Sequence, residues 1–314
     1  MILMEATPEM SRARDRDTYG AWGGPLPMAA YLQFEWRPRN HPWARAARAL
    51  WLLCADDGEV LTSCETYRMP SLRSDGPAMG HSYGVASVYT EPHKRRLGYV
   101  TELLTRLAGH LASLDPSAQA MFLFSDVALG VYQRSGFVAR PALNLAFAAM
   151  PGDPGQGVDE LLPEHRAAQA LAAIAPPGGP FAILPDGDQI DWHLERERIF
   201  AAVMGRSRPP ACGARLGGAT ALWAAEYRTG QLMVLLLHAP GPGEAEALLA
   251  CARRTAHAAG LARAVLWKTP RDGPWPEAQP EDRAERLDSV PMVLPLDARV
   301  RAVDWEWIPR VLWV

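Results

Sequence analysis

The sequence Gly84-Val-Ala-Ser-Val-Tyr-Thr90, followed by Arg95-Arg-Leu-Gly98-Tyr-Val100 and later by Tyr132-Gln-Arg-Ser-Gly136-Phe137, decides the fold. Its first segment has the β-branched and aromatic residues of a strand. Residues 98–114 repeat apolar side chains at helical spacing, and residues 120–124 form a short apolar strand. The basic loop at residues 92–97, between the 84–90 strand and this helix, therefore leads into the N-terminus of the helix. Unpaired backbone N–H groups at that helix N-terminus, together with two arginines, favour an anion such as a pyrophosphate.

The flanking segments predict a repeated mixed α/β unit. Upstream, two apolar runs surround the tight turn Asp56-Asp57-Gly58, which predicts a hairpin, and residues 70–80 are expected to form a polar loop. Residues 1–49 are rich in turns and aromatic residues, with short helices expected at 27–36 and 41–50. Downstream, a strand pair, an Ala/Leu-rich helix and a short strand recur between residues 220 and 267. With a Pro/Gly-rich linker at 151–157, this order predicts domains at residues 1–150 and 158–314.

Composition excludes several classes of protein. Of 314 residues, 48% are hydrophobic and 21% charged, so the chain can bury sizeable cores. The net charge of −3 argues against a general nucleic-acid or membrane surface, and no apolar run approaches the roughly 18 residues of a spanning helix. Four cysteines without a C-x-x-C pair indicate reduced thiols in a cytoplasmic protein. The histidines lack metal-ligand spacing, so no metal is expected.

Two of these motifs are similar to those of a known family. Residues 95–100 resemble the Q/R-x-x-G-x-G/A loop of the GNAT acetyltransferase superfamily, and residues 132–137 resemble its Y-x-x-x-G-F segment. Segments at 61–67, 123–126, 191–197, 287–292 and 304–314 resemble the fungal lysine N6-acetyltransferase family and its bacterial relatives. The resemblance implies tandem GNAT folds: an N-terminal catalytic domain and a divergent C-terminal domain. No cofactor loop precedes the helix after Pro240, so one coenzyme is expected.

The resemblance also implies a set of functional residues. Acetyl-CoA, or another acyl-CoA, is the implied co-substrate; its pantetheine arm would pair with the end of the 84–90 strand and its pyrophosphate would lie on the loop. Tyr132 is implied as the acid that protonates the departing thiolate. The residues expected to contact the coenzyme are Val88, Tyr89, Thr90, Arg95, Arg96, Leu97, Gly98, Tyr99, Val100 and Ser125.

The amine acceptor needs a base, because a free lysine amine is mostly protonated at neutral pH. Glu65 is the first candidate, since a carboxylate within an apolar strand needs a reason to be there, and Asp126 is the second. A structural role is equally open for each. Trp192 and His193 are candidate substrate contacts, with packing between the two halves as the alternative. Trp192, Trp305, Trp307 and Trp313 supply much aromatic area, some of which is expected between the halves.

The predicted function is acyl transfer from acetyl-CoA to a primary amine, with a lysine side chain of a small molecule or peptide as acceptor. Two alternatives remain. Arg96 and Val100 stand where the family usually has small residues, which leaves room for a non-catalytic acyl-CoA-binding or scaffold protein. A longer acyl donor is the other alternative. No nucleic-acid or membrane partner is expected, and the sequence does not fix the oligomeric state.

Overall fold

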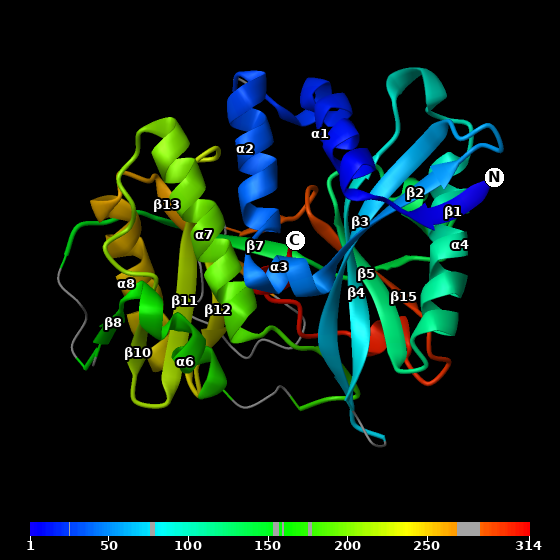
Figure 1. The fold of residues 1–314 in the computed structure, drawn as a ribbon. Helices are drawn as coiled ribbons and strands as arrows, with labels where there is room; N and C mark the ends of the chain where they lie inside the picture. Colours follow the sequence, from blue (N-terminus) through cyan, green and yellow to red (C-terminus); the bar gives the residue numbers. More distant parts are fainter. Residues whose placement is uncertain (25, 76–78, 153–156, 159, 175–177, 269–282) are drawn as a thin grey trace.

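The computed structural model describes the whole chain except residues 25, 76–78, 153–156, 159, 175–177 and 269–282. Two β-sheets lie side by side (Figure 1). Helices α1 (Pro8–Trp22) and α2 (Met28–Arg39) lie toward the top of this view, and α7 (Gly187–Met204) runs down in front of the second sheet. The first sheet has the order β1 (Ile2–Glu5), β2 (Arg48–Cys54), β3 (Val60–Arg73), β4 (Met79–Tyr89), β5 (Ala118–Ser125), β15 (Val290–Pro295) and β6 (Val138–Ala139), with β9 (Phe181–Ile183) paired to β3. The second has the order β14 (Arg283–Glu285), β7 (Leu143–Ala148), β13 (Arg263–Lys268), β12 (Gln231–His238), β11 (Ala219–Glu226), β10 (Gly213–Leu216) and β8 (Glu160–Leu162).

Each sheet contains the same crossover unit. Helix α4 (Tyr99–Leu114) connects the parallel strands β4 and β5, and α8 (Pro242–Ala258) connects the parallel strands β12 and β13. The remaining helices are α1 (Pro8–Trp22), α2 (Met28–Arg39), α3 (Pro42–Ala47), α5 (Gly130–Gln133), α6 (Ala167–Ala172) and α7 (Gly187–Met204), with 3₁₀ turns at Pro92–Lys94, Glu164–Arg166, Ala302–Asp304 and Arg310–Leu312.

The two sheets exchange strands. Strand β15, from the C-terminal part of the chain, lies between β5 and β6 of the first sheet. Strand β7, which precedes residue 150, pairs with β13 of the second sheet. Strand pairing thus crosses the expected boundary between residues 1–150 and 158–314 in both directions, and most of the expected linker lies outside the described residues. That boundary remains a prediction.

Two local predictions were wrong. Residues 8–22 form helix α1, which starts at the Thr7 cap with Pro8 in its first turn. The buried side chains of α1 are Arg14, Asp15 and Thr18, so no apolar periodicity announces the helix. In addition, β3 extends to Arg73 and β4 begins at Met79, so the expected polar loop at 70–80 is mostly strand.

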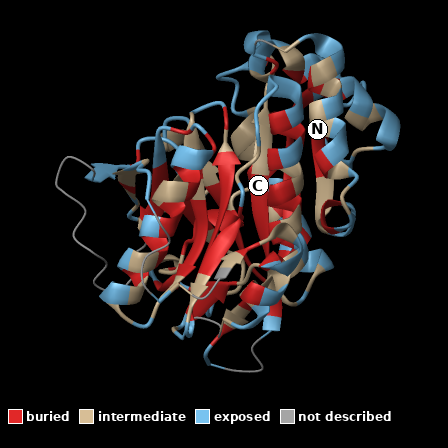
Figure 2. Cartoon of the chain, turned by 90° about the vertical axis from the view of Figure 1, so that its left-hand side faces the viewer, coloured by how far each residue is buried: buried red, intermediate tan, exposed pale blue. Residues whose placement is uncertain are grey.

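Buried residues lie in the strands and on the inner faces of the helices (Figure 2). One core cluster joins the two halves: Trp43 of α3 packs 5.2 Å from Trp192 of α7, ring centre to ring centre. Trp305, fully buried, packs against Phe122 of β5 at 5.5 Å. The expected aromatic contact between the halves is therefore present. None of the described helices has the length and apolarity needed to cross a membrane.

Candidate functional site

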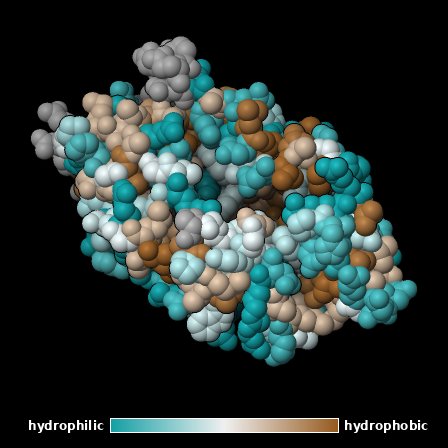
Figure 3. Space-filling model, turned by 90° about the horizontal axis from the view of Figure 1, so that it is seen from above, coloured by the Kyte–Doolittle hydropathy of each residue, from teal (hydrophilic) through white to brown (hydrophobic). Residues whose placement is uncertain are grey.

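A cavity of about 610 Å³ lies between the two halves, where β4 and β5 separate. The last paired residues are Val85 and Leu123, and β4 then continues to Tyr89 without a partner on that side. Ser87, with φ of 51°, marks an irregularity in the pairing of β4 with β3. The β5-facing backbone of residues 86–88 therefore faces the cavity. Seen from above, the molecule has a recess near its centre among hydrophilic and hydrophobic side chains (Figure 3).

The loop before α4 has the features of an anion site. Gly98 caps the helix with φ of 85°, no side chain caps its first turn, and an added Cβ at Gly98 would meet only open space. Arg96 also has a positive φ of 66°, a conformation that costs a non-glycine residue roughly 1–2 kcal/mol. Val100 packs against the apolar cluster beneath α4, so its branched side chain is accommodated in the core. The first-turn N–H groups thus remain open beside two exposed arginines.

The other residues expected to contact the coenzyme lie in varied surroundings. Val88 lines the cavity. The backbone oxygens of Tyr89 and Thr90 accept hydrogen bonds from Thr62 Oγ1 (2.9 Å) and Arg95 Nε (2.9 Å), so they are already engaged. Ser125 is buried and its hydroxyl donates to Val127 O at 2.8 Å, closing a turn after β5. Leu97 and Tyr99 flank Gly98, with Leu97 exposed and Tyr99 packed on the core. Their contacts with a coenzyme remain predictions.

Tyr132, the acid that the family resemblance implies, lies at the cavity wall. It belongs to α5, is 9% exposed and lines the cavity. Burial raises the pKa of its hydroxyl to about 12, so the phenol is protonated at every physiological pH. Its hydroxyl donates no hydrogen bond to any described residue. A donor is thus free at the cavity wall.

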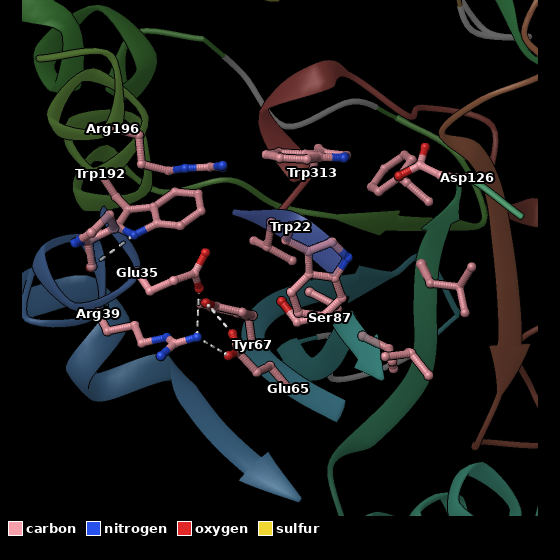
Figure 4. A pocket seen from close by; sticks show the side chains of 18 of the residues that line it. Trp22, Glu35, Arg39, Glu65, Tyr67, Ser87, Asp126, Trp192, Arg196 and Trp313 are labelled. Atoms are coloured by element: carbon pink, nitrogen blue, oxygen red, sulfur yellow. Dashed lines mark hydrogen bonds and ion pairs between the residues drawn. The ribbon is translucent and has the colours of Figure 1, made fainter. Parts of the chain in front are cut away.

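Glu65 is buried, and its carboxylate is bound by three guanidinium groups, whereas a general base needs a carboxylate that can accept a proton. Its Oε1 accepts from Arg39 Nη2 (2.9 Å), Arg48 Nη2 (3.0 Å) and Arg14 Nη1 (3.3 Å), and Tyr67 donates to Oε2 (3.0 Å), as Figure 4 shows in part. Burial opposes ionisation, but the three guanidiniums outweigh burial and hold the pKa of Glu65 well below its usual range. A carboxylate of such low basicity is a poor proton acceptor at neutral pH.

Two other carboxylates at the cavity are better placed. Asp126 is exposed at its edge, where Oδ1 accepts from the backbone N (2.8 Å) and Oγ (3.0 Å) of Ser289. Glu35 on α2 lines the cavity and accepts from Arg39 Nη2 at 2.8 Å. Burial raises the pKa of Glu35, with the Arg39 charge acting against it. Glu35 was not among the predicted site residues, because its neighbours in the sequence form no motif. The packing of α2 places Glu35 at the cavity.

Of the two candidate substrate contacts, Trp192 lies at the cavity and His193 lies against the C-terminal segment. Trp192 lines the cavity and donates from Nε1 to Pro38 O at 3.1 Å. His193 points to the C-terminal segment, where Nε2 lies 2.8 Å from Val311 O; since a carbonyl only accepts, that nitrogen carries the proton. Burial and the nearby Arg310 lower the pKa of His193 to about 3, so it stays neutral. The geometry gives His193 a structural contact away from the cavity.

The second half contributes cavity residues that the sequence analysis did not identify. Arg196, one turn along α7 from Trp192, extends between the rings of Trp192 and Trp313 (Figure 4). Glu226 of β11 also lines the cavity. At the equivalent helix start of the second half, Glu244 lies in the first turn of α8, with its carboxylate folded toward Gly241. A carboxylate there disfavours a second pyrophosphate. Among the described residues, no cluster of three or more His, Cys, Asp or Glu side chains is arranged to hold a metal.

Comparison with known proteins finds similar proteins over most of the chain. Residues 164–314 match a family model described as the LYC1 GNAT-like C-terminal domain. A lysine acetyltransferase from Yarrowia lipolytica is 21% identical, covering 87% of this chain and 86% of that protein. A GCN5-related N-acetyltransferase from Kribbella flavida superposes with a TM-score of 0.61 at 16% identity, covering 95% of this chain and 72% of that one. Eis1 from Mycobacterium abscessus does so with a TM-score of 0.56 at 16% identity, covering 95% and 74%. The expected mixed α/β tandem GNAT fold is confirmed.

Proposed function

Because this chain belongs to the GNAT superfamily of N-acetyltransferases, we propose that it transfers an acetyl group from acetyl-CoA to the side-chain amine of lysine. The observation that carries the proposal is the single cavity joining the unpaired edge of β4, the hydroxyl-bearing Tyr132 and an acidic and aromatic wall from the other half. The relative from Yarrowia lipolytica, named as a lysine acetyltransferase, supports the choice of acceptor.

Coenzyme binding follows from the N-terminal half. The open N-terminus of α4 and the exposed Arg95 and Arg96 suit a pyrophosphate. The free edge of β4 offers backbone groups to an extended pantetheine arm, as a sheet edge does to an added strand. A backbone N–H near Val88 would then donate to the thioester carbonyl and stabilise the oxyanion.

The transfer requires two proton movements. The lysine nitrogen attacks the thioester carbon, the C–N bond forms, and the C–S bond breaks as the thiolate leaves. We assign removal of the amine proton to Glu35, whose raised pKa brings it closer to the working pH than an ordinary carboxylate, with Asp126 as the alternative. Tyr132 donates its hydroxyl proton toward the departing sulfur. Glu65 holds the arginine cluster in place and stays ionised.

The test is an amine-dependent release of CoA by the full chain. Acetyl-CoA is supplied with L-lysine, a lysine-containing peptide or a polyamine, free thiol is measured, and mass spectrometry locates the acetyl group. Acetylation of lysine at N6 supports the proposal. Binding of acetyl-CoA without amine-dependent release would favour a non-catalytic acyl-CoA-binding protein. Faster release from a longer acyl-CoA would move the donor assignment to that chain length.

A further inference from the structure

Arg196 is a cation at the cavity wall that lacks an ion-pair partner in the part of the chain that the structure describes. Its guanidinium carbon lies 4.9 Å from the ring centre of Trp192 and 4.6 Å from that of Trp313. Arg39 pairs with Glu35 and Glu65, and Arg198 pairs with Glu164. Arg310, which also packs on Trp313, resembles Arg196 in having no ion pair among the described residues, but it does not line the cavity. Arg196 is partly buried, and burial lowers its pKa. A guanidinium removed from water without an anionic partner is unfavourable, so the site fits an anion that arrives with the substrate.

The two indoles determine which donors Arg196 can offer. Aromatic rings attract a guanidinium to their faces but offer it no acceptor oxygen, so this arrangement, here called the clamp, leaves the N–H groups of Arg196 available to another partner. Planar N–H donors match the two oxygens of a carboxylate. Arg310, which does not line the cavity, also packs on Trp313, at 4.0 Å from the ring centre. The clamp is therefore held by contacts outside the cavity and does not depend on a ligand to form.

Carboxylates line the same cavity. Glu35 and Glu226 are among its lining residues, and neither forms an ion pair with Arg196, although the charge of Glu226 raises the pKa of Arg196 against the effect of burial. A cavity with an unpaired guanidinium and separate carboxylates suits an acceptor that carries both an amine and a carboxylate. A polyamine would leave the guanidinium unpaired beside added positive charge.

We propose that Arg196, held between Trp192 and Trp313, binds a carboxylate of the acceptor and so makes the enzyme select amines that carry one, as a free amino acid or a C-terminal residue does. This inference rests on the proposed acetyl transfer to lysine and names the part of the acceptor that the second half recognises. It also gives the divergent half a role: it supplies the clamp, while the first half supplies the coenzyme site and Tyr132.

The experiment compares L-lysine with L-lysinamide, which keeps both amines and replaces the carboxylate by a neutral amide. With saturating acetyl-CoA, the wild-type chain should have a kcat/KM for lysine about 10- to 100-fold higher, as a charge-assisted bidentate contact is worth. Arg196→Met should reduce the kcat/KM for lysine to about the value for lysinamide, mainly by raising KM. The same variant should change the kcat/KM for lysinamide less than about threefold. Arg196→Lys, which keeps the charge without the planar donors, should fall between.

The control is Arg198→Met. Arg198 lies on the same helix, is exposed and pairs with Glu164 and Glu195 outside the cavity. The kcat/KM values for lysine and for lysinamide should therefore both stay at their wild-type levels in this variant. Equal losses for lysine and lysinamide in Arg196→Met would make Arg196 a structural residue and overturn the inference, as would equal use of both substrates by the wild type.

A binding measurement separates this inference from the proposed function. Thermal stabilisation by lysine and by lysinamide, with CoA present, reports recognition without turnover. Stabilisation by lysine that Arg196→Met abolishes, without acetylation of any amine, would sustain the carboxylate site and refute the acetyl transfer. If lysine is acetylated at N6 and Arg196→Met changes neither assay, the acetyl transfer stands and the carboxylate site is refuted. A peptide ending in lysine, compared with free lysine, distinguishes a protein C-terminus from a free amino acid as the source of the carboxylate.

Discussion

Replacing Glu65 by glutamine separates a structural carboxylate from a catalytic base. In the native cluster, the guanidiniums of Arg14, Arg39 and Arg48 face the carboxylates of Glu65, Glu35 and Asp15. Glu65→Gln leaves three cations with two anions, and it removes the only carboxylate within ion-pair distance of Arg48 among the described residues. The amide NH₂ would also face donors. Breaking a buried pair in this way costs about 3–5 kcal/mol.

For a chain of 314 residues, such a loss lowers the melting temperature by about 5–8 °C, which thermal denaturation followed by circular dichroism measures. Glu102→Gln is the matched control: Glu102 pairs with Arg106 on the exposed face of α4, at 2.6 Å, and surface pairs contribute less than about 1 kcal/mol. The control should melt within about 2 °C of the wild type.

The pH dependence of turnover then decides the role of Glu65. A structural Glu65 predicts the same fractional loss of kcat/KM at pH 7 and at pH 9.5. Loss in Glu35→Gln, by contrast, should shrink as pH rises toward the lysine amine pKa of about 10.4, because the amine then deprotonates unaided. Near-native melting of Glu65→Gln, together with recovery of its activity at high pH, would refute this reasoning and restore Glu65 as the base.

Four further predictions address the remaining roles. Tyr132→Phe should keep CoA affinity and lower kcat about 10²–10⁴-fold at every pH, as stopped-flow and steady-state assays can show; normal turnover would leave the motif as a marker of fold alone. Arg95→Ala and Arg96→Ala should each weaken CoA about 5- to 100-fold in calorimetry, and unchanged affinity in both would reject the placement of the pyrophosphate. His193 stays neutral in the folded chain down to about pH 3, whereas the unfolded chain protonates it below about pH 6.5. The free energy of unfolding should therefore fall as pH drops, by about 2 kcal/mol at pH 5. His193→Gln should make this fall smaller in urea titrations, and an unchanged dependence on pH would contradict the buried, neutral state of His193. A fragment of residues 1–150 lacks β15 and exposes the edge of β5, so it should aggregate in size-exclusion chromatography; a monodisperse, active fragment would show that the exchanged strand is dispensable.

Local patterns in the sequence determined the elements on either side of the loop at residues 95–100. The turn at Asp56-Asp57-Gly58, the helix after Gly98 and the crossover to β5 were all predicted, because each depends on neighbours within a few residues. The family motifs lie in the same stretch, so the fold class and the superfamily followed from it. Tyr132 was singled out from a motif of the same kind; it lies within α5 and lines the cavity, and its catalytic role remains a prediction.

Only the tertiary structure decided the rest of the site. Glu65 looked like a base because its strand is apolar, and its three arginine partners come from α1, α2 and β2. Strand β15 contains Pro291 and Pro295, which argue against a strand inside a sheet, yet it pairs with β5 along its length and with β6 at two residues. Arg196 meets Trp313 across more than a hundred residues of chain. Periodicity reports which face of an element is buried but not which distant side chain it meets, so pairings that close only in the folded chain leave no local signal.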